Sequence, residues 1–215
     1  DVGSYYKGEH LNDIWGLTTI GIAKSQEEMD AHLAKVDQSS VGTNWGVGDI
    51  MYADLDGDGK ISNGTNKLGD TGDYRIIGNS TPRFKYGITL DAAWKGFDFS
   101  IFMQGIGKRD LWLDGCYFWG ANGQGNEWQS TGFAEHWDFF RPEGDPLGAN
   151  LNSYYPRVNF SGDRNTKVQT RYLQNGAYLR LKNVQLGYTL PRVWTEKAGI
   201  SSVRVYVSGD NLATI

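Results

Sequence analysis

Hydrophobic and polar residues alternate most clearly along residues 84–94. Every second position of this run holds an aromatic or aliphatic side chain, namely Phe84, Tyr86, Ile88, Leu90, Ala92 and Trp94. A period of two is typical of a β-strand. A second alternating run at residues 97–107 follows the dipeptide Lys95-Gly96. Two such runs around a short turn that contains glycine predict a β-hairpin.

Two more strands are predicted near the end of the sequence. The first alternates at residues 184–190 and ends at Pro191, which cannot donate a hydrogen bond to a neighbouring strand. The second alternates at residues 203–208. We expect the connector between them to contain a single helical turn at residues 194–199.

The strand at residues 84–94 has the length of a membrane span. Its 11 residues extend for about 36 Å, and a tilt of about 45° reduces this to about 25 Å, the height of the apolar band of an outer-membrane barrel. Aromatic residues occupy both ends of its apolar side, as they do at membrane interfaces. A hairpin of a soluble β-sandwich shows the same alternation, so the hairpin alone leaves both interpretations open.

The connections between the predicted strands are unequal in length. Residues 95–96 and 191–202 are short connections, whereas residues 1–82 and 108–176 form long segments. Outer-membrane barrels have short periplasmic turns at one end and long extracellular loops at the other. We therefore predict an all-β fold of antiparallel, up-and-down transmembrane β-barrel strands with long extracellular loops.

This interpretation divides the chain into four parts. They are an extracellular loop region with an aspartate-rich loop and a short helix (residues 1–82), a barrel hairpin (83–107), a long aromatic-rich extracellular loop (108–176) and further barrel strands (177–215). Ser25 and Glu28 form a capping box that predicts the helix. The barrel is incomplete over this length, so we expect the chain to be a fragment of a longer protein.

The sharpest motif is Asp54-Leu55-Asp56-Gly57-Asp58-Gly59-Lys60-Ile61-Ser62, which matches the first nine positions of an EF-hand calcium loop. The carboxylates at positions 1, 3 and 5 converge as the chain curls, and the glycine at position 6 permits the sharp turn. Position 12 is Thr65 rather than glutamate, so a later acid, Asp70 or Asp73, has to complete the ligand set. The flanking sequence predicts no helices, so a complete EF-hand is not expected.

Charge also favours a cation at this loop. Residues 49–73 contain six aspartates and two lysines, a net charge of −4 that equals the formal charge of the whole chain. Carboxylates held together without a counterion repel one another, although an Asx-rich turn that points its carboxylates into water has a similar sequence. We predict a structural Ca²⁺ bound by Asp54, Asp56, Asp58, the Lys60 carbonyl, Ser62 and Asp73.

Residues 112–140 are rich in aromatic side chains, which are interleaved with glycine, asparagine and glutamine. Exposed rings beside amides bind sugars and peptides by stacking and by directed hydrogen bonds. A long ordered loop also needs a core of its own, which is the alternative for each single ring. The predicted ligand or partner surface consists of Trp112, Tyr117, Trp119 and Trp128.

Composition excludes several classes of protein. A single cysteine, Cys116, cannot form an intramolecular disulfide or a thiolate zinc site. The 25 acidic residues outnumber the 21 basic ones, which argues against a nucleic-acid partner. The three histidines lie in separate segments, and the nucleophile-elbow, P-loop and zinc-protease motifs are missing from the sequence, so we do not predict an enzyme.

Several further motifs follow one another in a fixed order. They are Asp13-Ile14-Trp15-Gly16, Tyr74-Arg75-Ile76-Ile77-Gly78-Asn79, Pro82-Arg83-Phe84-Lys85-Tyr86-Gly87, Lys95-Gly96-Phe97-Asp98-Phe99-Ser100, Tyr178-Leu179-Arg180-Leu181-Lys182-Asn183-Val184 and Leu186-Gly187-Tyr188-Thr189-Leu190-Pro191. Together with the aspartate-rich loop, they resemble the C-terminal part of the SusC/RagA-type TonB-dependent transporters of Bacteroidetes. The resemblance covers nearly the whole chain.

The resemblance implies a large β-barrel with an N-terminal plug domain in the cell outer membrane. It also implies a SusD-like surface lipoprotein as partner, which captures a glycan or peptide, and import driven by the TonB complex through parts absent from this chain. In the family, Asp73 stands where the last acid of the calcium-type loop is usual, although an insertion precedes it here.

A soluble, secreted, calcium-stabilised carbohydrate-binding β-domain is the alternative function. The two functions differ in what covers the apolar strand faces, which include Ile88, Leu90, Ile101, Leu186 and Val205. These side chains face lipid in a transporter, whereas they face a second sheet in a soluble domain.

Overall fold

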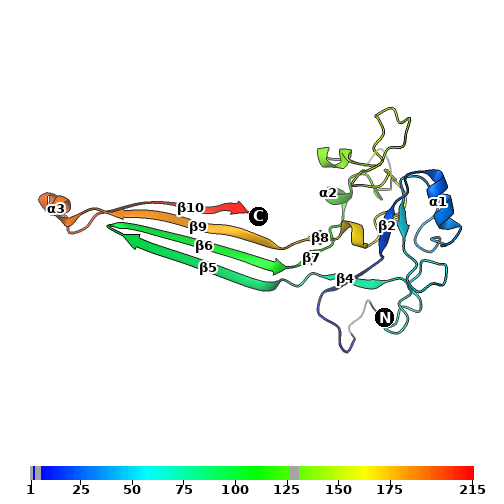
Figure 1. Ribbon diagram of the computed structural model, residues 1–215, viewed down its shortest axis with the longest axis horizontal. Helices are drawn as coiled ribbons and strands as arrows, with labels where there is room; N and C mark the ends of the chain where they lie inside the picture. The colour runs from blue at the N-terminus through cyan, green and yellow to red at the C-terminus, as the bar shows by residue number, and fades with distance from the viewer. Residues whose placement is uncertain (1, 3–5, 126–130) are drawn as a thin grey trace. The chain divides into compact units, whose positions relative to one another are not determined.

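The computed structural model describes residue 2, residues 6–125 and residues 131–215. The chain forms two compact units, each built from two segments that are distant in sequence (Figure 1). Unit 1 contains Asp1–Ser80 and Leu111–Gln174, and unit 2 contains Thr81–Asp110 and Asn175–Ile215. Among the helices of the described residues, none is long and apolar enough to cross a membrane.

Unit 2 is a four-stranded antiparallel sheet in the order β10-β9-β6-β5. Its strands are β5 (Arg83–Trp94), β6 (Phe97–Lys108), β9 (Tyr178–Thr189) and β10 (Arg204–Thr214). The hairpin and the two later strands are therefore confirmed, and β9 and β10 are longer than the alternation predicts. Between them lie α3 (Arg192–Thr195) and the 3-10 helix η4 (Glu196–Ala198), which form the short helical connector.

The conformation of two residues explains why the connection between β5 and β6 is so short. Lys95 and Gly96 both have positive φ, 47° and 91°, as both central residues of a type I′ turn require. A Cβ atom on Gly96 would lie 2.9 Å from the carbonyl oxygen of Thr189, so glycine is also required sterically.

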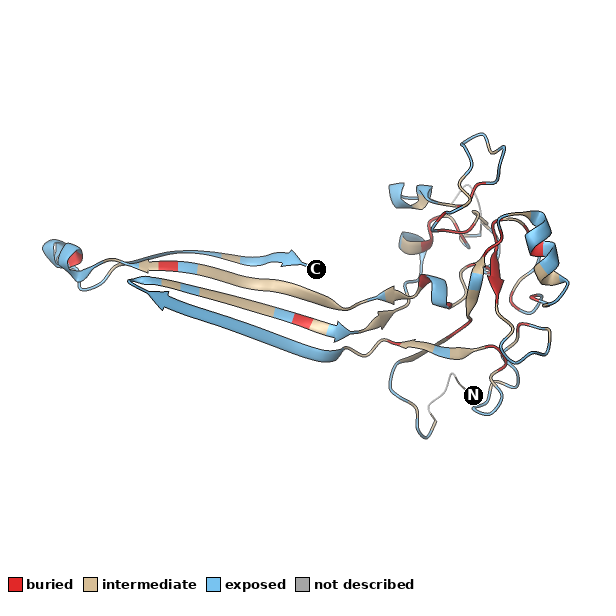
Figure 2. Cartoon of the chain, viewed as in Figure 1, coloured by how far each residue is buried: buried red, intermediate tan, exposed pale blue. Residues whose placement is uncertain are grey.

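The strand register aligns apolar side chains into rows on one face of the sheet. Three rows cross this face, Leu90–Ile101–Val184, Ala92–Phe99–Leu186–Val207 and Trp94–Phe97–Tyr188–Val205. The row Asp91–Ser100–Gln185–Ser208 belongs to the opposite face and is polar. Most of these side chains are exposed, by 53% at Leu90 and 63% at Val205, whereas Ile101, Val184 and Tyr188 are half-buried. Figure 2 shows β5 exposed along its whole length.

Unit 1 combines short strands and helices. β1 (Asp13–Gly16) pairs with β4 (Arg75–Asn79), and β2 (Thr19–Ile22) pairs with β3 (Ile50–Tyr52). The helices are α1 (Gln26–Leu33), α2 (Cys116–Trp119) and the 3-10 helices η2 (Ala134–Trp137) and η3 (Thr170–Tyr172). At the points where the chain passes from one unit to the other, the two-residue strands β7 (Asp110–Leu111) and β8 (Gln174–Asn175) pair with each other.

Helix α1 begins where its capping box predicts. The Ser25 hydroxyl accepts a hydrogen bond from the backbone N–H of Glu28 at 3.2 Å. The Glu28 carboxylate accepts one from the N–H of Lys24 at 2.6 Å, one residue before the usual partner. The helix buries Met29 completely.

The core of unit 1 contains side chains from both of its segments. Leu17, Ile50, Tyr52 and Ile61 come from the first segment, and Trp119, Phe140, Tyr155 and Tyr172 come from the second. Residues 1–80 and 111–174 therefore share one hydrophobic core, and this core holds the aspartate-rich loop between β3 and β4.

Candidate functional site

The aspartate-rich loop brings three of its predicted ligands together. Asp54, Asp56 and Asp58 each place one carboxylate oxygen within 4.8 Å of the other two. The backbone holds this arrangement, because the Asp54 carboxylate accepts hydrogen bonds from the N–H groups of Gly57 at 2.7 Å and Gly59 at 2.9 Å. Oxygen ligands grouped in this way are those that Ca²⁺ prefers.

The electrostatics of the loop differ from one carboxylate to the next. The backbone N–H of Gly59 lowers the pKa of Asp54. At Asp56 the N–H of Asp58 also acts to lower the pKa, but partial desolvation and the charges of Asp73, Asp58 and Asp54 outweigh it and raise the pKa. The ionised form of Asp56 is therefore disfavoured by its neighbours, and a bound cation would remove that penalty.

The buried Asp73 carboxylate connects the two ends of the loop. One oxygen accepts from the N–H of Leu55 at 2.6 Å, and the other accepts from the N–H of Ser62 at 2.8 Å. Asp73 is not among the three grouped carboxylates, so its role as a direct ligand stays a prediction. Asp70 accepts from the N–H of Thr65 at 3.1 Å and orders the insertion.

The remaining predicted ligands lie where the loop rejoins the core. Lys60 donates its backbone N–H to Asp58 at 2.8 Å, and the Ser62 hydroxyl accepts from the N–H of Gly64 at 3.1 Å. The side chain of Ile61, between them, is completely buried, and its backbone N–H donates to the Asp37 carbonyl at 2.8 Å. The loop is thereby anchored, whereas the metal roles of Lys60 and Ser62 stay predictions.

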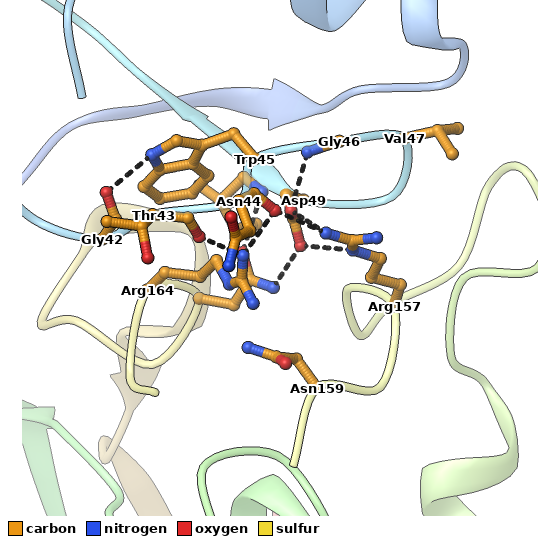
Figure 3. A network of polar contacts seen from close by, with 12 residues as sticks. Gly42, Thr43, Asn44, Trp45, Gly46, Val47, Asp49, Arg157, Asn159 and Arg164 are labelled. Carbon is orange, nitrogen blue, oxygen red and sulfur yellow. Dashed lines mark hydrogen bonds and ion pairs between the residues drawn. The ribbon is translucent and has the colours of Figure 1, made fainter. Parts of the chain in front are cut away.

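Asp49 belongs to a separate network, shown in Figure 3. Its buried carboxylate accepts hydrogen bonds from Arg157 at 2.8 and 2.6 Å and from Asn165 at 2.8 Å. Arg164 donates to the backbone carbonyls of Thr43 and Asn44. These contacts join sequence-distant parts of unit 1, so Asp49 stabilises the fold instead of enlarging the carboxylate cluster.

The predicted aromatic surface contains rings of different exposure. Tyr117 is 83% exposed and stacks on Phe133, with ring centroids 5.6 Å apart. Trp119 is only 2% exposed and packs in the core, and the half-buried Trp112 lies 5.8 Å from it. Trp128 lies outside the described residues. The role of these rings in ligand or partner contact stays a prediction.

A cavity of about 240 Å³ lies beside Trp119. Its other walls include Phe133, His136, Phe139 and Tyr155. His136 Nδ1 accepts from the N–H of Phe133 at 2.9 Å, so Nε2 carries the proton and donates to the Phe118 carbonyl at 3.0 Å. Sequence patterns did not reveal His136 and Tyr155 as cavity residues, because the contacts that place them are between distant segments.

The chain is similar to known receptors over most of its length, although no protein-family model matches it. TonB-dependent receptor P3 of Formosa agariphila is 34% identical over 168 residues, which are 78% of this chain and 14% of the relative. TonB-dependent receptor P26 of the same organism is 30% identical over 208 residues, 95% of this chain and 18% of the relative. The chain thus spans less than a fifth of the length of these curated relatives.

Solved structures share the fold. The RagAB peptide transporter matches with a TM-score of 0.58, and the RagAB peptide importer in its open-open state matches with 0.56. In both comparisons the identity is 20% and the match covers 94% of this chain and 19% of the other chain. These likenesses agree with the antiparallel, up-and-down strand arrangement predicted from the alternating runs.

Proposed function

This chain belongs to the TonB-dependent receptors and forms a part of such a protein. From this membership and the resemblance to SusC/RagA-type members, we propose that the whole protein imports oligosaccharides or oligopeptides across the outer membrane. The apolar face of unit 2 supports this proposal most directly. Its rows of apolar side chains, with Trp94, Phe97 and Tyr188 in one end row, are mostly exposed and suit contact with lipid.

The proposed partners follow from the same family membership. A SusD-like surface lipoprotein would deliver the nutrient, and TonB would supply energy through parts of the protein outside this chain. We expect no enzymatic activity, since the relatives are named as receptors and the solved neighbours as transporters. In this proposal unit 1 would lie outside the cell and would contact the lipoprotein or the nutrient.

We also propose that the aspartate-rich loop binds a structural Ca²⁺. The grouped oxygens of Asp54, Asp56 and Asp58 fit a hard cation. Desolvation and the charges of Asp73, Asp58 and Asp54 raise the pKa of Asp56, and a bound cation would favour its ionised form. The ion would fasten the loop between β3 and β4 to the core of unit 1.

Cell fractionation of the native producer tests the transport function. We expect the full-length protein in the outer membrane, extractable only with detergent, together with a lipoprotein identified by mass spectrometry. Recovery without detergent in a soluble fraction would contradict the proposal. A deletion strain that still grows on every oligosaccharide or peptide mixture used by the parent would also contradict it.

A further inference from the structure

A polar pocket in unit 1 adjoins the network of Asp49. Its volume is about 360 Å³, within the usual range of small-molecule sites. Two segments that are distant in sequence form its walls, namely residues 42–44 and residues 161–164. The Arg164 side chain crosses from one wall to the other, because its Nη1 donates hydrogen bonds to the backbone carbonyls of Thr43 and Asn44 (Figure 3). The guanidinium group therefore lies at the pocket, between the two walls.

Arg164 is only 8% exposed, and no acid among the described residues pairs with it. The nearby Asp49 carboxylate accepts two hydrogen bonds from Arg157. Asn165 and the backbone N–H of Gly46 donate two more to the same carboxylate. The two arginines and one aspartate thus carry one surplus positive charge. Burial lowers the pKa of Arg164, and the Asp49 charge offsets this only in part. A buried cation without a counter-charge is unfavourable, and a bound anion would remove that penalty.

The guanidinium of Arg164 also keeps free donors, one on Nε and two on Nη2. No described residue accepts a hydrogen bond from them, since both bonds that the side chain makes come from Nη1. Solvent reaches these two nitrogens, because neither is among the buried, unpartnered polar atoms of the described residues. Nε and Nη2 are the pair of donors with which Arg157 binds both oxygens of Asp49. In Arg164 the same two-donor fork is accessible and unpaired.

We propose that this pocket binds the carboxylate group of an acidic ligand through Nε and Nη2 of Arg164. A carboxylate presents two oxygens in one plane and so matches the fork. The pocket lining contains one acid, Asp163, which is 69% exposed and pairs with Lys167 Nζ at 2.7 Å, so its charge is offset. The inference goes beyond import, because every residue that carries it lies in unit 1 and none of them requires that the protein transport a nutrient.

Binding to the full-length receptor in a non-ionic detergent tests the proposal. The probes are two matched pairs, trigalacturonate with its methyl ester and triglycine with triglycine amide, so that the members of a pair differ in the carboxylate. Titration calorimetry and saturation-transfer NMR measure the binding. We expect at least one acid to bind about tenfold or more tightly than its ester or amide, and NaCl to weaken that binding. The pair that responds identifies a uronic acid or a peptide C-terminus as the source of the carboxylate.

Two variants connect the binding to the pocket. Arg164→Lys keeps the charge and a donor for the carbonyls of Thr43 and Asn44 but loses the fork, so it should weaken acid binding by about tenfold. Ser161→Trp places a large ring at an exposed position of the wall and should block the acid. The control Ser39→Trp places the same ring at an exposed position outside the lining and should leave binding unchanged. If Arg164→Lys does not fold, Ser161→Trp carries the test alone.

The outcomes separate this inference from the transport function. Absence of acid binding, or equal affinity for each acid and its ester or amide, overturns the carboxylate site. Acid binding that persists unchanged in Ser161→Trp or in a folded Arg164→Lys also overturns it. An outer-membrane receptor with its lipoprotein that binds neither acid refutes the carboxylate site alone. A protein that is not recovered from the outer membrane but binds an acid through Arg164 refutes the transport function alone.

Discussion

The carboxylates of Asp54 and Asp56 are close neighbours with opposite pKa shifts, so their amide variants should behave oppositely without calcium. Asp54 stabilises the loop by accepting two backbone hydrogen bonds, and Asp54→Asn should lower the melting temperature in a chelator. The Asp56 carboxylate is partly desolvated and lies among other negative charges, so Asp56→Asn should maintain or raise the melting temperature in a chelator. Both variants should also weaken the affinity of the loop for Ca²⁺ by about tenfold or more, because each removes a charged ligand.

The pH dependence of the calcium-free protein follows from the same shifts. The raised pKa of Asp56 means that the folded state binds its proton more readily than the unfolded state, so the destabilisation by this group disappears as pH falls through that pKa. The advantage of Asp56→Asn should therefore vanish at acidic pH. Asp54 has a lowered pKa, so its stabilisation is lost as pH falls. Thermal unfolding at several pH values measures both.

Arg157 should matter more for stability than its partly exposed position implies. Arg157→Ala leaves the completely buried Asp49 carboxylate without its charged partner, which typically destabilises a protein by about 3–5 kcal/mol. We expect faster proteolysis of unit 1 in the full-length receptor. Lys167→Ala breaks an ion pair with Asp163, which is 69% exposed, and should change stability by less than about 1 kcal/mol. Equal effects of the two variants would contradict this assignment.

At the scale of single residues, the sequence located the aspartate cluster because its spacing is local. It did not separate Asp49 from that cluster, since the partners of Asp49 at Arg157 and Asn165 are more than a hundred positions away. The sequence also did not predict that Trp119 is buried, because glycine and amide residues flank both buried and exposed aromatic residues in this segment.

At the scale of elements, adjacent residues of β5 should tolerate charge differently. Leu90 lies in an apolar row of the sheet, and Asp91 lies in the polar row beside it. Leu90→Arg should destabilise a lipid-facing strand by about 2–4 kcal/mol, whereas Asp91→Arg should have little effect. The folded fraction is read from heat-modifiable gel mobility of the membrane-extracted receptor. Equal tolerance at both positions would indicate that the apolar rows do not face lipid.

The strands were predictable because consecutive residues alternate between apolar and polar side chains. For β5 and β6, the two-residue turn at Lys95-Gly96 also fixes the register of the pair. The lengths of β9 and β10 were less predictable. In β9, Lys182 and Asn183 interrupt the alternation, and a register irregularity lies opposite them between Phe102 and Met103 of β6.

At the scale of the whole molecule, the composition of unit 1 could not be read from the sequence. The two long segments look like separate loops, because nothing local links Tyr52 with Arg164 or Leu17 with Val168. The structure joins them by hydrogen bonds of 2.7 and 2.8 Å and by a shared core. The loop that we propose to bind calcium therefore depends on a segment that begins about fifty residues after it.

This dependence predicts that the second segment is required for the first to be ordered. Replacing residues 112–173 of the full-length receptor by a short flexible linker removes Trp119, Phe140, Tyr155 and Tyr172 from the core. Tyr52 and Ile61 then lose their packing partners, and we expect amide hydrogen exchange across residues 13–61 to rise towards that of an unfolded segment. Calcium should no longer slow exchange in the aspartate-rich loop. The point variant Tyr117→Ser, at an exposed ring of the deleted segment, is the matched control and should retain protection. Preserved protection in the deletion variant would show that residues 1–80 fold without the second segment.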